Sequence, residues 1–432
     1  MKVALIHPRW SFEGSIYFGC REAHLPIELG YAAALLARAG HEARIIDAQA
    51  RDLGPDDVRA EVTRFGADAA VITTAPSYLF WRCAPPELRV PQQVRCALAG
   101  AVGLTIAVGP HASTTPRAAL RKLGVDAAVV GEGEEVLPLL CDAPRSRWGS
   151  IPSIAFREGD EMRVTSGPRV AHLDALPPLA WEDAAIAAHA HHHHRFDATP
   201  TGPGAEIEAS RGCPYRCTFC AKEEARDLYR RRPLVTVLEE LDRLVSQGVT
   251  YVYFIDEIFL PDEALLEAVE ARRIHFGVQL RIDNWSAPMI DLLGRAGCVS
   301  IEAGVESVTP EGRSLLAKRC RLTTRELVER LCHAKKRVPF VQANLMESAS
   351  DAPADIVAFR DELRRRGVWA NDPVPLFPYP GSPEHRARFG ELADDAWERA
   401  VDDYLGRFRA LSDLQDDHPR PLAELEGEPL GG

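Results

Sequence analysis

Short apolar runs alternate with helical segments along the amino-terminal third of the chain. Runs of this length, rich in Val, Ile and Ala, are typical of strands that are buried on both faces of a parallel sheet. The five runs are KVALIH (2–7), ARIID (43–47), AAVITT (69–74), LTIAV (104–108) and AAVV (127–130). The helical segments between them lie at 27–40, 56–65, 91–99 and 115–123. The pattern predicts an α/β structure with a doubly wound sheet over residues 1–145, of the flavodoxin-like or Rossmann-like kind.

Ligands of a doubly wound sheet bind beyond the carboxyl ends of its strands. After three of the predicted strands the chain places small residues, which leave room for a flat or elongated ligand. The candidate ligand-binding residues are Thr73, Thr74, Ser77, Gly109, Pro110, His111, Gly131, Glu132 and Gly133. No Gly-x-Gly-x-x-Gly motif follows the first strand, which argues against a dinucleotide as the ligand.

A second series of strands and helices is predicted over residues 205–390. The strand candidates are AEIEA (205–209), TYVYFID (250–256), HFGVQLRI (275–282), CVSIEAGV (298–305), FVQANLM (340–346) and PVPLFPY (373–379). Between the first two, Val237, Leu241 and Leu244 form part of one apolar helical stripe, which Gly248 closes. Six such repeats predict a partial (βα)6 TIM-type barrel, with its active site at the carboxyl ends of the strands.

Two further segments complete the predicted domain organisation. Residues 146–204 are interpreted as a linker with a small hairpin and a histidine-rich run at 191–194, which we read as a polar insert rather than a metal site. Residues 391–432 are expected to form one carboxy-terminal helix, around WERAVDDYLGRF, and a tail.

Composition argues against several classes of protein. A formal net charge of -12 argues against a nucleic-acid-binding surface. No run approaches the roughly 18 to 20 apolar residues of a membrane-spanning helix, and the first residues do not resemble a secretory signal. We therefore expect a cytoplasmic protein. The ten cysteines of a long cytoplasmic chain are not expected to form a disulfide framework.

Three cysteines cluster in the segment RGCPYRCTFC, residues 211–220. Their i, i+4, i+7 spacing also describes one face of a helix, where they would simply be core residues. Against this, Gly212 and Pro214 disfavour a helix start, and Arg211 and Arg216 are poor core residues. A structural zinc site takes four ligands, and no fourth lies nearby. Iron-sulfur clusters commonly use four thiolates, but three thiolates on a cube of four irons leave one iron open to a substrate.

The motif CPYRCTFC resembles the cluster-binding loop of the radical S-adenosylmethionine (SAM) superfamily, with Phe219 as the aromatic residue before the last cysteine. The resemblance implies that Cys213, Cys217 and Cys220 hold a 4Fe-4S cluster, whose open iron binds the amino and carboxylate groups of SAM. It also implies reductive cleavage of SAM to a 5'-deoxyadenosyl radical, with an electron donor such as flavodoxin or ferredoxin.

Other segments of the second half fit the same resemblance less specifically. FIDEIF resembles an acidic segment after the second strand, which implies Asp256 or Glu257 as a partner of the SAM ammonium. GVES resembles a fourth-strand motif and implies Glu306, and RID offers Arg281 at the end of the third strand. A surface salt bridge is an equal interpretation for Glu306 and Arg281. The segment NLMESASD departs from the glycine- and proline-containing fifth strand of the family, which leaves SAM contacts there in doubt.

The first domain resembles the cobalamin-binding domain of the cobalamin-dependent branch of this superfamily. The motifs are ELGYAAALLARAGHEARIID, AAVITTAPS, AVGPHAS and VVGEGEEVLPLL. The Asp-x-His-x-x-Gly element that supplies a histidine to cobalt is absent from the sequence. The resemblance therefore implies a cobalamin with an extended tail and no histidine on cobalt. Tyr78 or Trp81 would cover its lower face, or else pack between domains.

The two resemblances together imply a methyltransferase that acts on an unactivated carbon of a small molecule, a saccharide or a secondary metabolite. One alternative keeps both cofactors but carries out oxidation, cyclisation or rearrangement. Sulfur insertion would ordinarily require a second cluster, and the other cysteines form no second clustered set in the sequence. An alternative of another class is a non-catalytic cobalamin or redox sensor.

Overall fold

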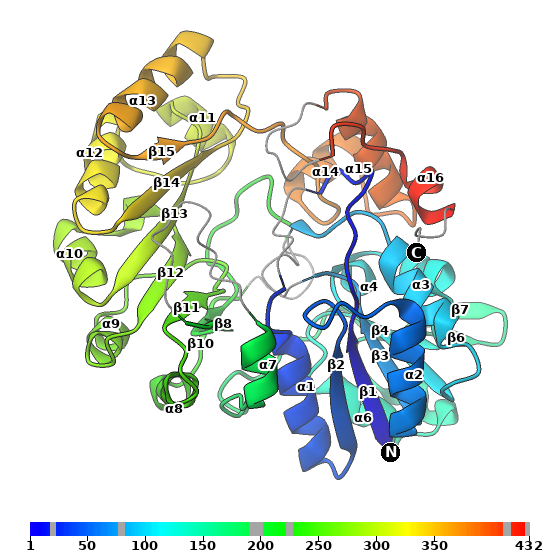
Figure 1. The fold of residues 1–432 in the computed structure, drawn as a ribbon. Helices are drawn as coiled ribbons and strands as arrows, with labels where there is room; N and C mark the ends of the chain where they lie inside the picture. Colours follow the sequence, from blue (N-terminus) through cyan, green and yellow to red (C-terminus); the bar gives the residue numbers. More distant parts are fainter. Residues whose placement is uncertain (18–22, 77–82, 190–201, 222–227, 409–415, 428–432) are drawn as a thin grey trace. The chain divides into compact units, whose positions relative to one another are not determined.

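The computed structural model describes residues 1–17, 23–76, 83–189, 202–221, 228–408 and 416–427. The chain divides into two compact units (Figure 1). The first comprises Met1–Trp181, Cys220–Asp227 and Phe377–Gly432, and the second comprises Glu182–Phe219 and Leu228–Leu376. Within the described ranges, no helix combines the length and the apolar character that crossing a bilayer requires.

The first unit contains a seven-stranded sheet in the order β2-β1-β3-β4-β5-β6-β7. Its strands are β1 (Lys2–His7), β2 (Glu42–Asp47), β3 (Ala69–Thr73), β4 (Leu104–Val108), β5 (Ala127–Val129), β6 (Ile154–Glu158) and β7 (Glu161–Val164). Its helices are α1 (Ile27–Arg38), α2 (Pro55–Phe65), α3 (Arg89–Ala97), α4 (Pro110–Thr114), α5 (Pro116–Leu123) and α6 (Val136–Asp142). The first five strands are parallel, and the order 2-1-3-4-5 confirms the predicted doubly wound sheet.

Alternation along the strands builds a core on each face of this sheet. Val3 and Leu5 of β1 pack in a cluster that includes residues of α1 and α6. Ala4 and Ile6 pack in a second cluster with residues of α2 and α3. Because successive side chains of a strand point to opposite faces, an uninterrupted apolar run places apolar side chains in both layers.

The hairpin expected within a linker belongs to the first sheet. β6 pairs antiparallel with β5, and β7 pairs with β6. The pairing follows from the apolar start of β6, because Ile154, Ala155 and Phe156 are all buried in the core of this unit. The boundary between the compact units follows Trp181, whereas we expected a linker over residues 146–204. The histidine-rich run 191–194 lies outside the described residues.

The second unit contains a six-stranded parallel sheet in the order β15-β14-β13-β12-β11-β8. Its strands are β8 (Gly204–Ile207), β11 (Tyr251–Phe254), β12 (His275–Leu280), β13 (Cys298–Glu306), β14 (Phe340–Leu345) and β15 (Trp369–Ala370). Its helices are α7 (Asp183–Ala188), α8 (Leu234–Ser246), α9 (Glu263–Glu270), α10 (Ala287–Arg295), α11 (Pro310–Leu315), α12 (Thr324–Lys335) and α13 (Pro353–Arg365). Helices α9, α10, α12 and α13 lie along one side of the sheet (Figure 1). This arrangement confirms the partial parallel barrel.

The predicted sixth strand of the barrel was wrong. We expected it at 373–379, but the sixth strand is β15, at Trp369–Ala370. Only an isolated bridge between Met346 and Val374 continues the pairing. Prolines at positions 373, 375 and 378 explain the difference, because proline has no N–H to donate to a ladder.

The carboxy-terminal residues group with the first unit and contain three helices, of which two lie beyond residue 391, where we expected one helix and a tail. The helices are α14 (Pro383–Phe389), α15 (Ala396–Leu405) and α16 (Leu422–Gly427). Lys122 joins α15 and α16 to the sheet domain, because its Nζ lies 2.7 Å from Glu398 Oε1 and 2.9 Å from Glu426 Oε2. The sequence pattern did not reveal α16, which is short and is held by this long-range ion pair.

Candidate active site

The cysteine loop of the second unit begins at a small sheet of β9 (Ser210–Arg211) and β10 (Arg230–Arg231). Buried charged residues anchor this start. Arg211 is fully buried and donates to both carboxylate oxygens of Glu208, at 2.9 and 3.0 Å. Arg232, also buried, donates to the Glu208 carbonyl at 2.7 Å and to Glu240 at 2.8 Å. Breaking either ion pair would leave an unpaired buried charge, which is costly. Arg211 and Arg232 therefore hold the first residues of the loop in place.

Asp256 and Glu257, which follow β11, hold the backbone of the same entry. Asp256 accepts hydrogen bonds from Ala209 N at 2.9 Å and from Ser210 Oγ. Glu257 accepts a hydrogen bond from Gly212 N at 2.6 Å. Burial raises the pKa of Asp256 to about 8, with further upward contributions from Glu208 and Glu257. The structure therefore gives both carboxylates a partner in the loop, where the sequence predicted the SAM ammonium as the partner.

The three predicted cluster ligands lie on irregular backbone. Cys213, Cys217 and Cys220 are half-buried and form no disulfide, and Phe219 is half-buried beside them. Cys220 is the first residue of a segment that groups with the first unit. The loop is fixed to the second unit where Thr218 N donates to Leu316 O at 3.1 Å.

In the part of the chain that the structure describes, no three Cys, His, Asp or Glu side chains converge as ligands of one metal ion. A 4Fe-4S cluster does not demand such convergence, because each thiolate binds a different iron of the cube. Three accessible thiols on one loop therefore fit a cluster, and they do not fit a mononuclear zinc site.

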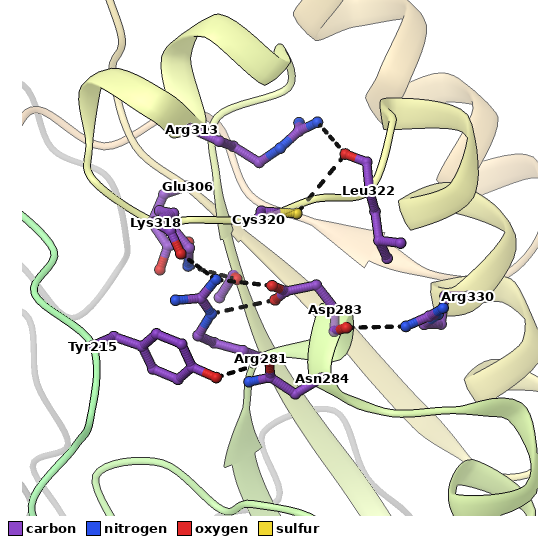
Figure 2. Close-up of polar contacts among 11 residues, drawn as sticks. Tyr215, Arg281, Asp283, Asn284, Glu306, Arg313, Lys318, Cys320, Leu322 and Arg330 are labelled. Atoms are coloured by element: carbon purple, nitrogen blue, oxygen red, sulfur yellow. Dashed lines mark hydrogen bonds and ion pairs between the residues drawn. The ribbon is translucent and has the colours of Figure 1, made fainter.

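Arg281 joins the cysteine loop to the end of β12 (Figure 2). Its guanidinium lies 3.9 Å from the centre of the Tyr215 ring and 2.8 Å from Asp283, and it donates to the Lys318 carbonyl. The Tyr215 hydroxyl donates to Asn284 Oδ1 at 2.8 Å. Burial raises the pKa of Tyr215, although the nearby Arg281 charge opposes this. The predicted residue Arg281 thus lies against the loop rather than on an open surface.

Glu306 forms an ion pair with Lys318 at the end of β13 (Figure 2). The Lys318 ammonium also donates to the Gly304 carbonyl at 2.9 Å. The side chains of Glu306 and Lys318 are 13% and 3% exposed, so the pair is largely withdrawn from water. Glu306 has a φ of 63°, a left-handed conformation that is uncommon for a residue with a Cβ and clusters at functional sites.

Lys318 was missed by the sequence reasoning. It follows α11 in an irregular segment, and no strand end or motif marked it. The signal that could have found it is its position: Lys318 lies three residues after α11, the helix that follows the GVES segment.

In the first unit, three buried polar side chains lie at the carboxyl ends of β1 and β3. They are His7, Thr73 and Thr74, all fully buried. Among the described residues, neither hydroxyl and neither His7 ring nitrogen has a hydrogen-bond partner. Burial lowers the pKa of His7, which keeps the ring neutral. Unpaired buried polar groups are rare, and here they fit a ligand that supplies the missing partners.

Gly109 brings the end of β4 against the same edge. A Cβ on this residue would lie 2.4 Å from Thr74 Oγ1, and its φ of 127° also favours glycine. Pro110 starts α4 directly afterwards. His111 is packed rather than open: its Nε2 lies 3.2 Å from the Pro86 carbonyl, and its ring stacks on Trp397 with centroids 4.4 Å apart. Burial lowers the pKa of His111 to about 3.

The residues after β5 bind a segment of the chain itself. Gly131 has a φ of 91°, and a Cβ there would lie 2.4 Å from Arg169 N. Glu132 is fully buried and accepts a hydrogen bond from Ala171 N at 2.7 Å. A Cβ on Gly133 would lie 3.4 Å from Val108 Cγ1. Gly131 and Glu132 therefore support residues 169–171. Ser77, Tyr78 and Trp81 lie outside the described residues.

Two parts of the chain match known domain families. Residues 20–140 match the B12 binding domain, and residues 207–351 match the radical SAM superfamily. These matches confirm the three expected cofactors: cobalamin, SAM and a 4Fe-4S cluster.

Similar curated proteins include the uncharacterized methyltransferase PH0819 of Pyrococcus horikoshii, 24% identical over 325 residues, or 72% of this chain and 66% of that protein. The anaerobic magnesium-protoporphyrin IX monomethyl ester cyclase of Cereibacter sphaeroides is 24% identical over 332 residues, or 71% of this chain and 50% of that one. The chain therefore spans between half and two thirds of the length of these relatives.

A solved structure shows the same fold. It is the radical SAM methyltransferase TsrM from Kitasatospora setae with cobalamin and a 4Fe-4S cluster bound, with a TM-score of 0.66 and 18% identity over 89% of this chain and 73% of that chain. The chain therefore consists of a B12-binding domain followed by a radical SAM domain, and it belongs with the cobalamin-dependent radical SAM proteins.

Proposed function

We propose that this protein is a cobalamin-dependent methyltransferase that methylates an unactivated carbon of a small molecule, a saccharide or a secondary metabolite. The presence of both domains in one chain carries the proposal. A carbon radical cannot readily take the electrophilic methyl group of SAM, so a radical enzyme that methylates carbon requires a second methyl carrier. Methyltransferases among the similar proteins support the same reaction class.

The cysteine loop would hold the cluster through Cys213, Cys217 and Cys220. When bound, the cofactors supply a hydrogen-abstracting radical and a transferable methyl group. Glu306 and Lys318 present one negative and one positive charge at the end of β13, which suits the ammonium and carboxylate of the methionine part of SAM. Binding there would exchange their mutual ion pair for two ion pairs with the ligand.

The loop around the cysteines depends on positioning residues. Arg281 holds Tyr215, and Asp256 and Glu257 hold the backbone at 209–212. Phe219 sits between Thr218, which is fixed to Leu316, and the last cysteine. These contacts hold the start of the loop, Tyr215 and Thr218 in place.

In the first unit, cobalamin would lie at the carboxyl edge of the sheet. The buried hydroxyls of Thr73 and Thr74 and the imidazole of His7 support this placement, because they offer polar contacts that the described chain does not use. Gly109 and Pro110 shape the same edge, and the predicted contact Ser77 follows on the chain. We further propose a cytoplasmic location with a flavodoxin or ferredoxin as the electron donor.

The second candidate is a cobalamin-dependent oxidation or cyclisation without methyl transfer. The similarity to the magnesium-protoporphyrin IX monomethyl ester cyclase supports this candidate. The same two domains would serve that reaction.

Product analysis separates these candidates. The reconstituted protein, incubated with reductant, substrate extract and SAM carrying a deuterated methyl group, is expected to form S-adenosylhomocysteine, 5'-deoxyadenosine and a product with the labelled methyl. Formation of 5'-deoxyadenosine with an unlabelled product that has lost hydrogen would establish the second candidate. Failure of the reduced, cluster-loaded protein to cleave SAM would instead favour a non-catalytic cobalamin or redox sensor.

A further inference from the structure

Residues 311–325 carry an excess of positive charge in an otherwise acidic chain. The segment runs from α11 into α12 and contains five basic side chains and one carboxylate, Glu311, whereas the whole chain has a formal net charge of -12. Arg313 is buried and donates to backbone carbonyls, and Lys318 pairs with Glu306. The other three basic residues are exposed: Arg319, Arg321 and Arg325. The segment therefore presents positive charge to solvent.

The backbone of this segment separates the buried cation from the exposed one beside it. Ala317 and Arg319 have φ values of 53° and 54°. This left-handed conformation is uncommon for residues with a Cβ and clusters at functional sites. Lys318, between them, is 2% exposed, whereas Arg319 is exposed. The two left-handed residues thus turn one cation inward, to Glu306, and leave the next in water.

The same segment lies beside the cysteine loop. The Arg281 guanidinium stacks on the ring of Tyr215, 3.9 Å from its centre, and donates to the Lys318 carbonyl (Figure 2). The Thr218 N–H of the loop donates to the Leu316 carbonyl at 3.1 Å. Two separate contacts therefore fix the segment to the loop.

An arginine of the loop adds to the exposed positive charge. Arg216 directly precedes Cys217 and is exposed. Because Arg216 and Arg319 directly follow the two residues that contact Arg281, they lie on neighbouring segments. Across the described residues, Arg216, Arg319 and Arg321 form no ion pair. We call these three arginines the basic patch.

A large apolar side chain accompanies the basic patch. Leu315, the last residue of α11, is 66% exposed and directly precedes the residue whose carbonyl binds the loop. Arginine is enriched at protein interfaces, where apolar contacts form the core and polar groups the rim. A small anion would use the arginines and leave the leucine in water. The combination therefore suits an acidic protein that has an apolar spot among its carboxylates.

The chemistry of the loop requires an electron, and the basic patch lies where a donor would deliver it. Arg216 is next to Cys217, one of the proposed cluster ligands. The dimethylbenzene edge of a flavin is apolar and would face Leu315. In the transfer, the flavin hydroquinone loses one electron and becomes the semiquinone, and the oxidised cluster gains that electron.

We propose that the basic patch and Leu315 form the docking surface for the electron donor, and that this donor is a flavodoxin, an acidic protein with an exposed flavin edge. The inference rests on the proposed function. It adds the surface that receives the donor and names one class of donor.

The test uses the full-length protein, reconstituted with cluster and cobalamin and mixed with flavodoxin hydroquinone. Growth of the electron paramagnetic resonance signal of the reduced cluster, in rapidly frozen samples, gives the rate constant. A second arm replaces flavodoxin with photoreduced deazaflavin, a small reductant that has no protein surface to dock. A third arm uses an acidic ferredoxin, which lacks a flavin edge and is expected to be the slower protein donor.

Charge reversal in the basic patch is expected to have the largest effect. Arg319→Glu combined with Arg321→Glu should lower the rate constant with flavodoxin about thirtyfold at low ionic strength, and the difference should shrink as salt is added. Leu315→Ser should lower it about fivefold at both low and high salt, because salt does not screen an apolar contact. Reduction by deazaflavin should be unchanged in both variants.

The matched control reverses two exposed cations at the other end of the same sheet. Arg273 and Lys336 precede β12 and β14, so they lie at the amino-terminal ends of the strands. Arg273→Glu combined with Lys336→Glu changes the net charge by the same amount and should alter the rate constant less than about twofold.

Four results would overturn the inference. They are an unchanged rate in the patch variant, an equal loss in the control variant, slower reduction by deazaflavin in the patch variant, and a ferredoxin as fast as the flavodoxin. If SAM cleavage driven by deazaflavin persists in those cases, the proposed function still stands. A protein whose cluster accepts an electron from none of the three reductants would refute the proposed function and the inference with it.

Discussion

The two parallel sheets of this protein use their faces differently. In the first unit, β3 and β4 are buried at every residue, and helices cover both faces. In the second unit, β14 is buried only at every other residue. A sheet with two apolar faces offers a ligand only the edge where its strands end. A sheet with one half-exposed polar face also leaves hydrogen-bonding side chains on that face.

The largest expected effect concerns the edge of the second sheet. Cys213→Ala removes one of the three proposed cluster thiolates and should lower SAM cleavage by about a hundredfold or more. Cobalamin uptake by the first unit should be unchanged if the two edges work independently. The two readouts are 5'-deoxyadenosine formed and cobalamin retained after gel filtration.

Cys320→Ala is the matched control for this substitution, because Cys320 is also half-buried but lies outside the loop. Loss of cobalamin binding in Cys213→Ala would show that the two edges are coupled, and full SAM cleavage would exclude a cluster on this loop.

A pair of core substitutions compares the faces directly. Val71 is fully buried in the first sheet, so Val71→Asn buries an amide without a partner and should lower the free energy of unfolding by about 3 kcal/mol. Gln342→Val in β14 should change the free energy of unfolding by less than about 1 kcal/mol, because that side chain is half-exposed. Urea denaturation of both variants measures the difference. Equal destabilisation would mean that the Gln342 face of β14 is as tightly packed as the first sheet.

The pH dependence of stability should separate a buried histidine from an exposed one. Burial lowers the pKa of His111 from 6.5 to about 3, so below pH 6.5 the unfolded chain takes up a proton that the folded protein does not. The free energy of unfolding should therefore fall by about 1.5 kcal/mol as the pH is lowered from 6.5 to 5.0.

His111→Gln should remove this loss, whereas His275→Gln at an exposed position of β12 should not. Urea denaturation at the two pH values provides the comparison. An identical pH slope in wild type and His111→Gln would contradict a neutral His111 in the folded protein.

The smallest expected effect concerns the edge of the first sheet. Thr74→Val replaces a buried hydroxyl that has no partner among the described residues. Without cobalamin, the variant should be more stable by about 1 kcal/mol, because no unpaired hydroxyl remains. With cobalamin, it should bind more weakly, as measured by titration followed by absorbance. Greater stability with unchanged cobalamin affinity would remove Thr74 from the cofactor site.

The strands and the cofactor motif were predictable because they are local. An apolar run such as 104–108 shows its burial in its own composition, and β4 has those bounds. The loop RGCPYRCTFC likewise carries its chemistry within ten residues. The sixth strand could not be placed in this way. The apolar composition of 373–379 favoured a strand there, but its prolines have no N–H to donate, and the strand lies at Trp369–Ala370.

The partners of the charged residues were decided by the tertiary structure alone. Asp256 or Glu257 stays a predicted partner of SAM, but the sequence did not reveal that the Asp256 oxygens accept hydrogen bonds from Ala209 N and Ser210 Oγ, which precede it by more than forty residues. Gly131 and Glu132 were predicted as ligand contacts, and the sequence did not reveal that they also hold residues 169–171.

The sequence by itself determined most of the strands and helices and the three thiols that are the candidate cluster ligands, because hydrophobic periodicity and motif spacing act over a few neighbouring residues. Only the tertiary structure decided that Lys318 faces Glu306 and that Gln279, Glu302 and Gln342 share one face. The physical reason is that ion pairs and strand register depend on which distant segments meet. That choice follows from the packing of the whole unit.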